Sequence, residues 1–425
     1  MPVNFSGGGT VNINTNFNAG SSSYMSWATG GSVVNINNNA TFTAPFLFEV
    51  GNNTGTTTIN INTGGVMANT GQYLFCYAGG QGSTVNVNAG GQMQAYQIEL
   101  GQTQPGVLNL NGGLINADWI HTNNAIGGTL NLNGGTLEAS GAAGPAGLYS
   151  PWIASTASNP MTVNVLNGGA TFEVPTSYNA VVTATLLQGT NADGSLSTGG
   201  ISLTGGGTLT LESQETYTGP TSIQSGTLAL AHGGSIADSS SITVSSGATF
   251  DVSALGGGYT IGSHQSLIGT GTVAGNLTVQ GSLQPGSAGS TGTLAFNNNL
   301  TFSGTTISVA LDSSGNADNI VIDGTAAVSG TNTINVSSLG TSLTSGLYTL
   351  ITDANGGLAG TFLFSNGANT ETFTLGSNSY MLSLANSSTA ETINVAAVPE
   401  PATLGLFTIG GLALVLVGRK RKARA

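Results

Sequence analysis

Cations are almost absent from this sequence. All five lysines and arginines of the 425-residue chain lie after residue 418, whereas seventeen aspartates and glutamates are spread along it. A long acidic body without cations repels phosphate, so nucleic acid is excluded as a partner, and a Walker-type phosphate loop cannot form without lysine. The single cysteine, Cys76, cannot close an internal disulfide. Backbone ladders and apolar packing must therefore hold the fold.

A short alternating phrase recurs through the first part of the chain. Apolar residues alternate with asparagine or another small residue, as half-buried strands require. Most copies are followed by a Gly-Gly pair, which permits a sharp corner. The first five steps between copies, 22–26 residues each, fit one coil of a solenoid, with asparagines stacked in register. The copies are Val11–Asn14, Val34–Asn37, Ile59–Asn62, Val85–Asn88, Leu108–Asn111, Leu130–Asn133 and Val163–Leu166.

A second repeat follows at a shorter interval. Gly207–Leu211 (GTLTL) returns nineteen residues later as Gly226–Leu230 (GTLAL), with no helical pattern between the copies. With Thr216–Gly219 (TYTG) between them, these phrases resemble the passenger-associated repeat of autotransporter-type surface proteins. The resemblance covers about residues 201–365. Together the two repeats predict an all-β parallel β-helix, or solenoid, of about 16–18 turns.

The C-terminus has three parts in a fixed order. Val398–Pro401 (VPEP) precedes seventeen uncharged residues, 402–418, and then the basic run Arg419, Lys420, Arg421, Lys422. Seventeen apolar residues are just enough for a short transmembrane helix, and the cations predict a cytoplasmic tail. This order resembles the PEP-CTERM sorting signal, with Pro399, Glu400 and Pro401 at its motif. The resemblance implies processing by an exosortase-type enzyme. No secretory signal is visible after Met1, so we expect the natural product to begin upstream or to have lost that signal.

These patterns predict seven segments. They are Asn-rich solenoid repeats at 1–178, an irregular connection at 179–200, a passenger-associated repeat solenoid at 201–290, C-terminal solenoid turns and a cap at 291–390, a linker with the Pro-Glu-Pro motif at 391–401, a transmembrane helix at 402–418 and a basic cytoplasmic tail at 419–425.

Two groups of residues are candidate ligand sites. Asp312, Ser314, Asn316 and Asp318 occupy alternate positions and Asp323 follows, which partly matches a calcium loop. The match departs at Ala317, where such a loop needs glycine. The second group is Tyr149 and Trp152, on a Pro-rich loop at 141–160, which could stack on a glycan or fold back over the sheet. Apart from calcium, no cofactor is expected.

The sequence favours a surface protein over an enzyme. We expect an exported β-solenoid, anchored as a membrane precursor and then released to the cell surface or extracellular matrix, with a structural or adhesive role and with exopolysaccharide or other surface glycans as partners. The alternative is a carbohydrate-active β-helix enzyme, a polysaccharide hydrolase or lyase. A hydrolase needs two carboxylates about 5–10 Å apart. Candidate pairs are Glu212 with Glu215 and Asp312 with Asp318, whereas His121, His232 and His264 lie far apart in sequence.

Overall fold

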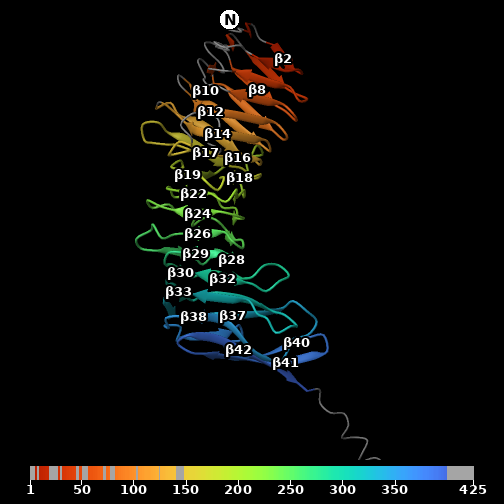
Figure 1. The fold of residues 1–425 in the computed structure, drawn as a ribbon, viewed down its shortest axis with the longest axis vertical. Coiled ribbons are helices and arrows are strands. Elements are labelled where there is room, and N and C mark those ends of the chain that lie inside the picture. Colours follow the sequence, from red (N-terminus) through yellow and green to blue (C-terminus); the bar gives the residue numbers. More distant parts are fainter. Residues whose placement is uncertain are drawn as a thin grey trace, which may run out of the picture.

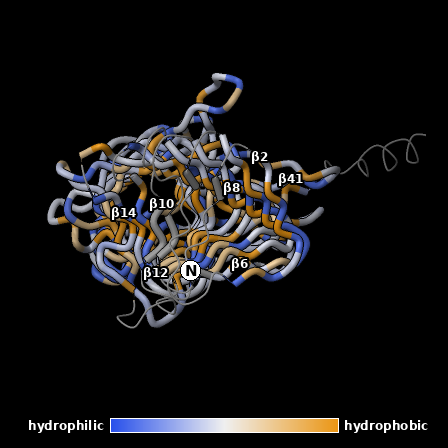
Figure 2. The backbone as a smooth tube through the Cα atoms, turned by 90° about the horizontal axis from the view of Figure 1, so that it is seen from above, coloured by the Kyte–Doolittle hydropathy of each residue, from blue (hydrophilic) through white to orange (hydrophobic). Residues whose placement is uncertain are grey.

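The computed structural model describes residues 5–6, 9–18, 27–28, 31–44, 47–49, 56–69, 73–76, 82–101, 104–123, 125–139 and 148–399. Within these ranges every regular element is a β-strand. The strands form a long rod with β2 near one end and β41 and β42 near the other (Figure 1). Viewed along the rod, successive turns lie over one another and loops project from the rim (Figure 2).

Five sheets make up the rod. An 8-stranded sheet contains β2 (Gly9–Ile13), β5 (Ser32–Ile36), β8 (Thr57–Ile61), β11 (Thr84–Asn88), β13 (Gly106–Asn111), β15 (Gly128–Leu132), β17 (Met161–Val165) and β20 (Leu186–Gln188). A 17-stranded sheet contains β3 (Phe17–Asn18), β6 (Thr41–Ala44), β7 (Leu47–Glu49), β9 (Val66–Asn69), β10 (Tyr73–Cys76), β12 (Gln92–Leu100), β14 (Leu114–His121), β16 (Thr136–Glu138), β18 (Ala170–Glu173), β21 (Ile201–Thr204), β23 (Thr221–Ile223), β25 (Ser241–Val244), β28 (Ser266–Gly269), β31 (Ser282–Pro285), β34 (Thr306–Leu311), β37 (Thr331–Ser338) and β39 (Thr361–Phe364).

The other three sheets complete the turns. An 11-stranded sheet contains β19 (Asn179–Val182), β22 (Thr208–Leu211), β24 (Thr227–Leu230), β26 (Thr249–Asp251), β29 (Thr272–Ala274), β32 (Thr293–Phe296), β35 (Asn319–Ile322), β38 (Gly346–Asp353), β40 (Thr370–Leu375), β41 (Asn378–Asn386) and β42 (Ala390–Val398). A 4-stranded sheet contains β27 (Tyr259–Ile261), β30 (Leu277–Val279), β33 (Leu300–Ser303) and β36 (Ala326–Ser329), and β1 (Phe5–Ser6) pairs with β4 (Trp27–Ala28).

Pairing between turns is parallel and in register, which confirms the predicted solenoid. The two copies of the shorter repeat form β22 and β24, in which Thr208 pairs with Thr227 and Leu209 with Leu228. Equivalent positions of successive turns therefore stack, and each inward column becomes a continuous apolar row. One such row, fully buried from end to end, is Val34, Ile59, Val85, Leu108, Leu130, Val163 and Leu186. Burying each of these side chains contributes about 1.5–3 kcal/mol.

Asparagine side chains form two hydrogen-bonded rows on the outer face of the 8-stranded sheet. In the longer row, each Nδ2 donates to the Oδ1 of the asparagine one turn earlier, at 2.7–2.9 Å. This confirms the stacking that the repeated phrase predicts. The longer row is Asn12, Asn35, Asn60, Asn86, Asn109, Asn131 and Asn164, and the shorter row is Asn14, Asn37, Asn62, Asn88 and Asn111.

The Gly-Gly pairs form the corners, as their positions in the repeat predict. At the corner after β11, Gly90 has φ of +74°, a conformation that disfavours other residues. A Cβ on the next residue, Gly91, would lie 2.2 Å from the carbonyl oxygen of Ile61 in the turn before. The pair therefore serves two needs, a left-handed backbone and close contact between turns.

The segment expected to be an irregular connection at 179–200 continues the stack. Its β19 pairs with β22 and its β20 pairs with β17. In the sequence of this segment, apolar and polar residues alternate over only a few positions. Even so, Ala180, Val182 and Leu186 are fully buried. The 8-stranded sheet ends at β20 and the 11-stranded sheet begins at β19. This segment is therefore where the cross-section of the rod changes.

The far end of the rod is closed by an antiparallel meander. β38 pairs in parallel with β35 but antiparallel with β42, which continues through β41 to β40. Reversing strand direction ends the parallel stack, as terminal repeats of a solenoid must do to protect the last apolar layer.

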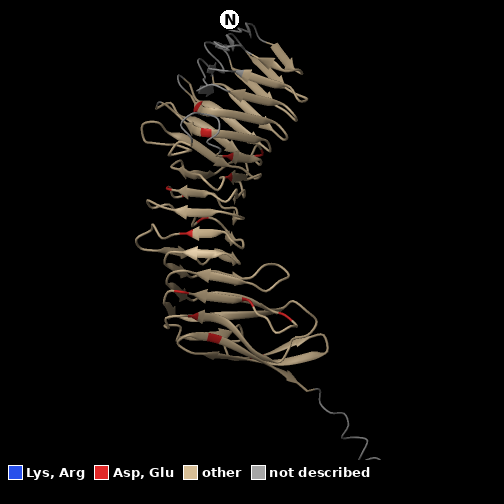
Figure 3. Cartoon of the chain, viewed as in Figure 1, with Lys and Arg blue, Asp and Glu red and all other residues tan. Residues whose placement is uncertain are grey.

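Acidic residues are distributed unevenly around the rod (Figure 3). None of the residues in the strands of the 8-stranded sheet is charged. The acidic residues before position 190 all lie on strands of the 17-stranded sheet, and they are Glu49, Glu99, Asp118, Glu138 and Glu173. The first half of the rod therefore has one uncharged side.

Candidate functional site

A stack of aromatic rings lies over β14, beside the loop that the sequence singles out for Tyr149. The Tyr149 ring stacks on Trp119 with ring centroids 4.9 Å apart, and Trp119 stacks on His121 at 3.6 Å. The hydroxyl of Tyr96 on β12 donates a hydrogen bond to the Tyr149 hydroxyl, with 2.7 Å between the two oxygens. Trp119 and Tyr149 are only half-buried, so aromatic surface remains at the exterior. This ring stack is the candidate contact surface of the first half of the rod.

Trp152 does not belong to this surface. Its side chain is fully buried, its indole N–H donates to the Ala117 carbonyl oxygen at 2.8 Å, and its ring packs edge-on against Phe172. The expectation that Trp152 contacts a glycan is therefore corrected, because the loop folds its tryptophan into the core. The structure supplies Trp119 at the ring stack instead.

The pairing of β12 with β14 brings the polar residues of the site next to one another. Gln97 on β12 lies opposite Trp119 on β14, and Glu99 lies opposite His121. Sequence reasoning missed this grouping. The structure shows the origin of the grouping in β12, where Ala95 and Ile98 are both fully buried although they are three residues apart. The strand therefore changes the face it turns to the core between them.

Burial shifts the pKa of both titratable groups of the site toward the uncharged form. Burial raises the pKa of Glu99 to about 7, although the nearby Asn123 side chain opposes the rise. Both Glu99 oxygens are buried and lack a hydrogen-bond partner of ordinary geometry within the described chain. Burial also lowers the pKa of His121 to about 4, against the contact with the Thr122 carbonyl. His121 Nδ1–H donates to that carbonyl, so its Nε2 accepts from Gln97.

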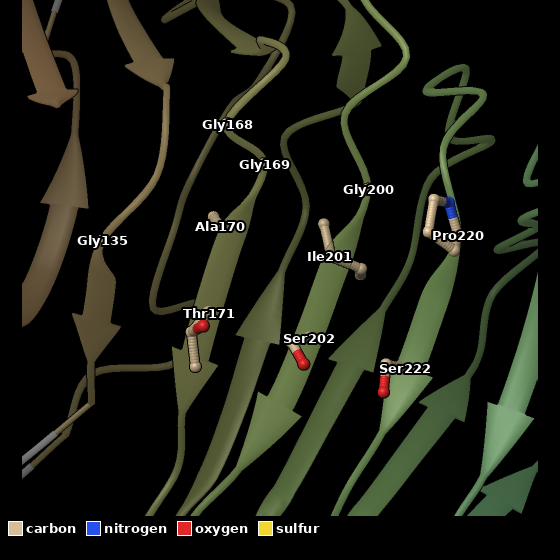
Figure 4. Close-up of a pocket in the computed structure, with 10 residues that line it drawn as sticks. All are labelled: Gly135, Gly168, Gly169, Ala170, Thr171, Gly200, Ile201, Ser202, Pro220 and Ser222. Atoms are coloured by element: carbon tan, nitrogen blue, oxygen red, sulfur yellow. The ribbon is translucent and has the colours of Figure 1, made fainter. Parts of the chain in front are cut away.

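A shallow groove of about 260 Å³ crosses β18, β21 and β23 (Figure 4). Thr171, Ser202 and Ser222 lie side by side on these strands and line its floor with hydroxyl groups. Gly169 and Gly200, at the starts of β18 and β21, contribute no side chain to its upper rim, whereas Pro220 does so before β23. No acid, base or cation lines this groove, so it offers neutral hydrogen bonding and no proton transfer.

Two carboxylates of the candidate calcium site, those of Asp312 and Asp318, accept hydrogen bonds from N–H groups of the same chain. Asp312 Oδ1 accepts the backbone N–H groups of Ser314 and Asn316, and the Asn316 side chain foremost keeps the pKa of Asp312 below its usual value. Asp318 is buried, and its oxygens accept the N–H groups of Gly292 and Ala310 at 2.8 Å. Asp323 is exposed. Within the described ranges, no three His, Cys, Asp or Glu side chains gather as a metal site would require.

Calcium binding by Asp312, Ser314, Asn316, Asp318 and Asp323 stays a prediction. If these residues hold the ion, millimolar calcium should raise the melting temperature, and Asp312→Ala should remove that rise. Thermal unfolding with and without calcium measures both effects. Calcium binding at these residues is contradicted if calcium leaves the melting temperature unchanged, or if the Asp312→Ala variant still shows the rise.

In each carboxylate pair proposed for hydrolysis, one member is buried and accepts backbone N–H groups. Glu212 lies at the surface, where its Oε1 is 2.8 Å from Nδ1 of His232. Glu215 is buried and accepts the Leu186 N–H. In the other pair, both Asp312 and Asp318 accept the backbone N–H groups named above. His264 is exposed.

Most residues of the sorting motif lie outside the described residues. Pro399 is the last described position, whereas Glu400, Pro401, residues 402–418 and the basic run from Arg419 to Lys422 are beyond it. Among the described residues, none forms a helix of the length and hydropathy that a bilayer span needs.

Comparison with known proteins identifies one segment. Residues 397–422 match the family model of the PEP-CTERM protein-sorting motif, which includes all three residues of Pro-Glu-Pro and the basic run. The C-terminus is thus a PEP-CTERM sorting signal, and such a signal implies export and processing by an exosortase. No curated protein matches the chain.

Among solved structures, the chain is similar to the crystal structure of the Haemophilus influenzae Hap adhesin, at 12% sequence identity and a TM-score of 0.27. The alignment covers 93% of this chain and 59% of that one, so the chain spans about three fifths of the adhesin's length.

Proposed function

We propose that this protein is a structural or adhesive β-solenoid of the cell surface or extracellular matrix, sorted there as a membrane-anchored precursor. The sorting signal at 397–422 is the observation that carries the proposal, because it places the rod on an export route. The rod itself supports the role. It presents long faces of hydroxyl and amide groups, and an acidic, cation-free body stays soluble outside the cell.

Glycans of the producing cell are the ligand class we propose for the ring stack of Trp119 and Tyr149. Aromatic rings bind sugars by covering their apolar faces, while hydroxyl groups hold the orientation. The hydroxyl of the half-buried Tyr149, which accepts from the buried Tyr96, supplies a polar group beside the rings. The carbohydrate-active enzyme is not favoured, since one carboxylate of each candidate pair, Glu215 or Asp318, is buried and accepts backbone N–H groups.

Replacing Tyr149 tests the glycan proposal. Tyr149→Ala removes the ring that stacks on Trp119 and should weaken binding to the producer's purified exopolysaccharide about fivefold, since one such ring contributes on the order of 1 kcal/mol. Calorimetric titration of the full chain measures the change. Phe373→Ala, which removes a half-buried ring from β40 at the other end of the rod, is the control. Equal binding by all three proteins, or none by wild type, contradicts the proposal.

Processing at the sorting signal predicts that the released protein has no basic side chain. Cleavage near Pro399–Pro401 would remove all five cations, because they lie beyond residue 418. Intact-mass measurement of protein collected outside the cell should give a chain ending near this motif. Trypsin should leave that chain whole, whereas a Glu-specific protease should cut it. Recovery of residues 419–425 from the exterior protein would mean that the segment is a permanent anchor.

A further inference from the structure

The uncharged side of the rod is a flat, regular face. The outer positions of the 8-stranded sheet form three columns, one of threonine and valine and two of asparagine. The first column, in register from strand to strand, is Thr10, Val33, Thr58, Thr84, Val107, Thr129 and Thr162. We call the three columns together the ladder face.

Each asparagine of the ladder face keeps hydrogen-bonding capacity. Asn86, for example, donates one N–H to Asn60 and accepts one from Asn109. A carboxamide has two N–H donors and two acceptor lone pairs, so one of each remains on every inner rung. Each asparagine row therefore repeats one remaining donor and one remaining acceptor at every inner rung.

Charge makes this face the one on which two copies can meet in the first half of the rod. The body carries carboxylates and no cation, so copies of it repel one another wherever acidic surfaces meet. The ladder face has no carboxylate in its strands, whereas Glu138 and Glu173 are partly exposed on the other long sheet. Close approach of two ladder faces therefore brings no like charges together.

Spacing and area also fit a second copy. Seven of its strands at the usual spacing, each up to six residues long, cover roughly 34 Å by 20 Å. Two such faces would bury roughly 1,400 Å² together, within the range of specific protein interfaces, about 1,200–2,000 Å². A second copy has the same repeat, so its donors and acceptors match rung by rung, as in stacked asparagine zippers.

We propose that the ladder face joins two copies of this chain face to face. The same patch is used by both partners, so the interface is isologous and closes as a dimer. The longer asparagine row lies in the middle of the contact, between the threonine and valine column and the shorter asparagine row, and the remaining amide groups bond across it. The proposal requires neither export nor glycan binding.

Two pairs of acidic substitutions test the proposal on the full chain in detergent. Thr84→Glu with Thr129→Glu adds charge to the ladder face without removing an asparagine. The matched control, Gln94→Glu with Asn116→Asp, adds the same charge to paired outward positions of β12 and β14. Light scattering coupled to size-exclusion chromatography gives the protein mass. We expect wild type and control to dimerise and the ladder-face variant to associate at least tenfold more weakly.

A cysteine gives a second measurement that does not depend on charge. Val107→Cys lies on β13, near the middle of the sheet, where a two-fold interface brings equivalent positions together. It should cross-link to its own copy with a short bis-maleimide, whereas Asn116→Cys should not; Cys76 is present in both. A monomeric wild type at all concentrations overturns the proposal, whether or not it binds a glycan. So does a folded ladder-face variant that dimerises as wild type does, or equal cross-linking of the two cysteine variants.

Discussion

Glu215→Gln should flatten the dependence of stability on pH between about 5 and 8. Glu215 is 3% exposed, and its Oε2 accepts the Leu186 N–H, while within the described chain Oε1 has no hydrogen-bond partner. Burial raises the pKa of this carboxyl to about 8, against the effect of the Leu186 hydrogen bond. The folded protein therefore keeps a proton that the unfolded chain releases near pH 4.5.

The sign of the effect follows from proton binding. Between pH 4.5 and 8 the folded state binds more protons at this site than the unfolded state does, so stability falls as pH rises. Below pH 4.5 both states are protonated and the site contributes no pH dependence. Above pH 8 the loss is complete and is on the order of 5 kcal/mol. Glu99 and Glu391, whose pKa values burial raises to about 7, add losses of the same sign.

Denaturant unfolding at several pH values measures this slope. The glutamine variant should be less stable than wild type at pH 5, because its amide N–H groups lack partners, and should gain on wild type toward pH 8. Glu212→Gln removes a surface acid three residues away and should leave the slope in place. A wild type whose stability does not fall with rising pH, or a Glu215 variant with an unchanged slope, would falsify this account.

Gly200→Ala should disrupt the stack at the groove. A Cβ at Gly200 would lie 1.9 Å from the Pro220 carbonyl oxygen and 2.7 Å from its nitrogen, both backbone atoms. The same carbonyl accepts the Ile201 N–H, and the Gly200 carbonyl accepts that of Ala170. To relieve the clash, the three turns that contain Ala170, Gly200 and Pro220 must therefore move apart. We expect a loss of about 3 kcal/mol or more, at the upper end of overpacking substitutions.

Gly256→Ala is the matched control. No atom lies within 4 Å of a Cβ there, and its φ is ordinary, so alanine should be neutral or should stabilise by up to about 1 kcal/mol. Hydrogen exchange in β21 and β23 locates the damage in the Gly200 variant. Equal stability of the two variants would show that the turns separate without cost.

Local repetition made the architecture predictable from sequence. The repeated motif around Asn86 and Asn109 predicts the position of each strand, the face that it buries and the strand with which it pairs. It does so because each turn repeats the sequence pattern of the turn before. Gly-Gly pairs such as Gly90 and Gly91 mark the corners for the same reason. Parallel pairing in register then follows from the equal intervals between copies.

The ring stack could not be predicted in this way, since it depends on positions where the repeat is broken. Trp119 and Tyr149 belong to different turns, and their contact depends on how the 141–160 loop returns to the sheet. A tryptophan on a loop can turn outward or inward, and the sequence leaves both open for Trp152. The choice depends on the space beside Phe172, which exists only once the turns have stacked.

The asparagine rows also give the rod a direction. Every amide of the longer row donates toward the N-terminal end and accepts from the C-terminal end, so all its dipoles point the same way. One amide that rotated by half a turn would set oxygen against oxygen on one side and nitrogen against nitrogen on the other. Single rungs are thus locked by their neighbours, and aligned hydrogen bonds strengthen one another. Within the row, as far as the described residues show it, Asn12 donates to no asparagine and Asn164 accepts from none, so the two ends of this row differ chemically.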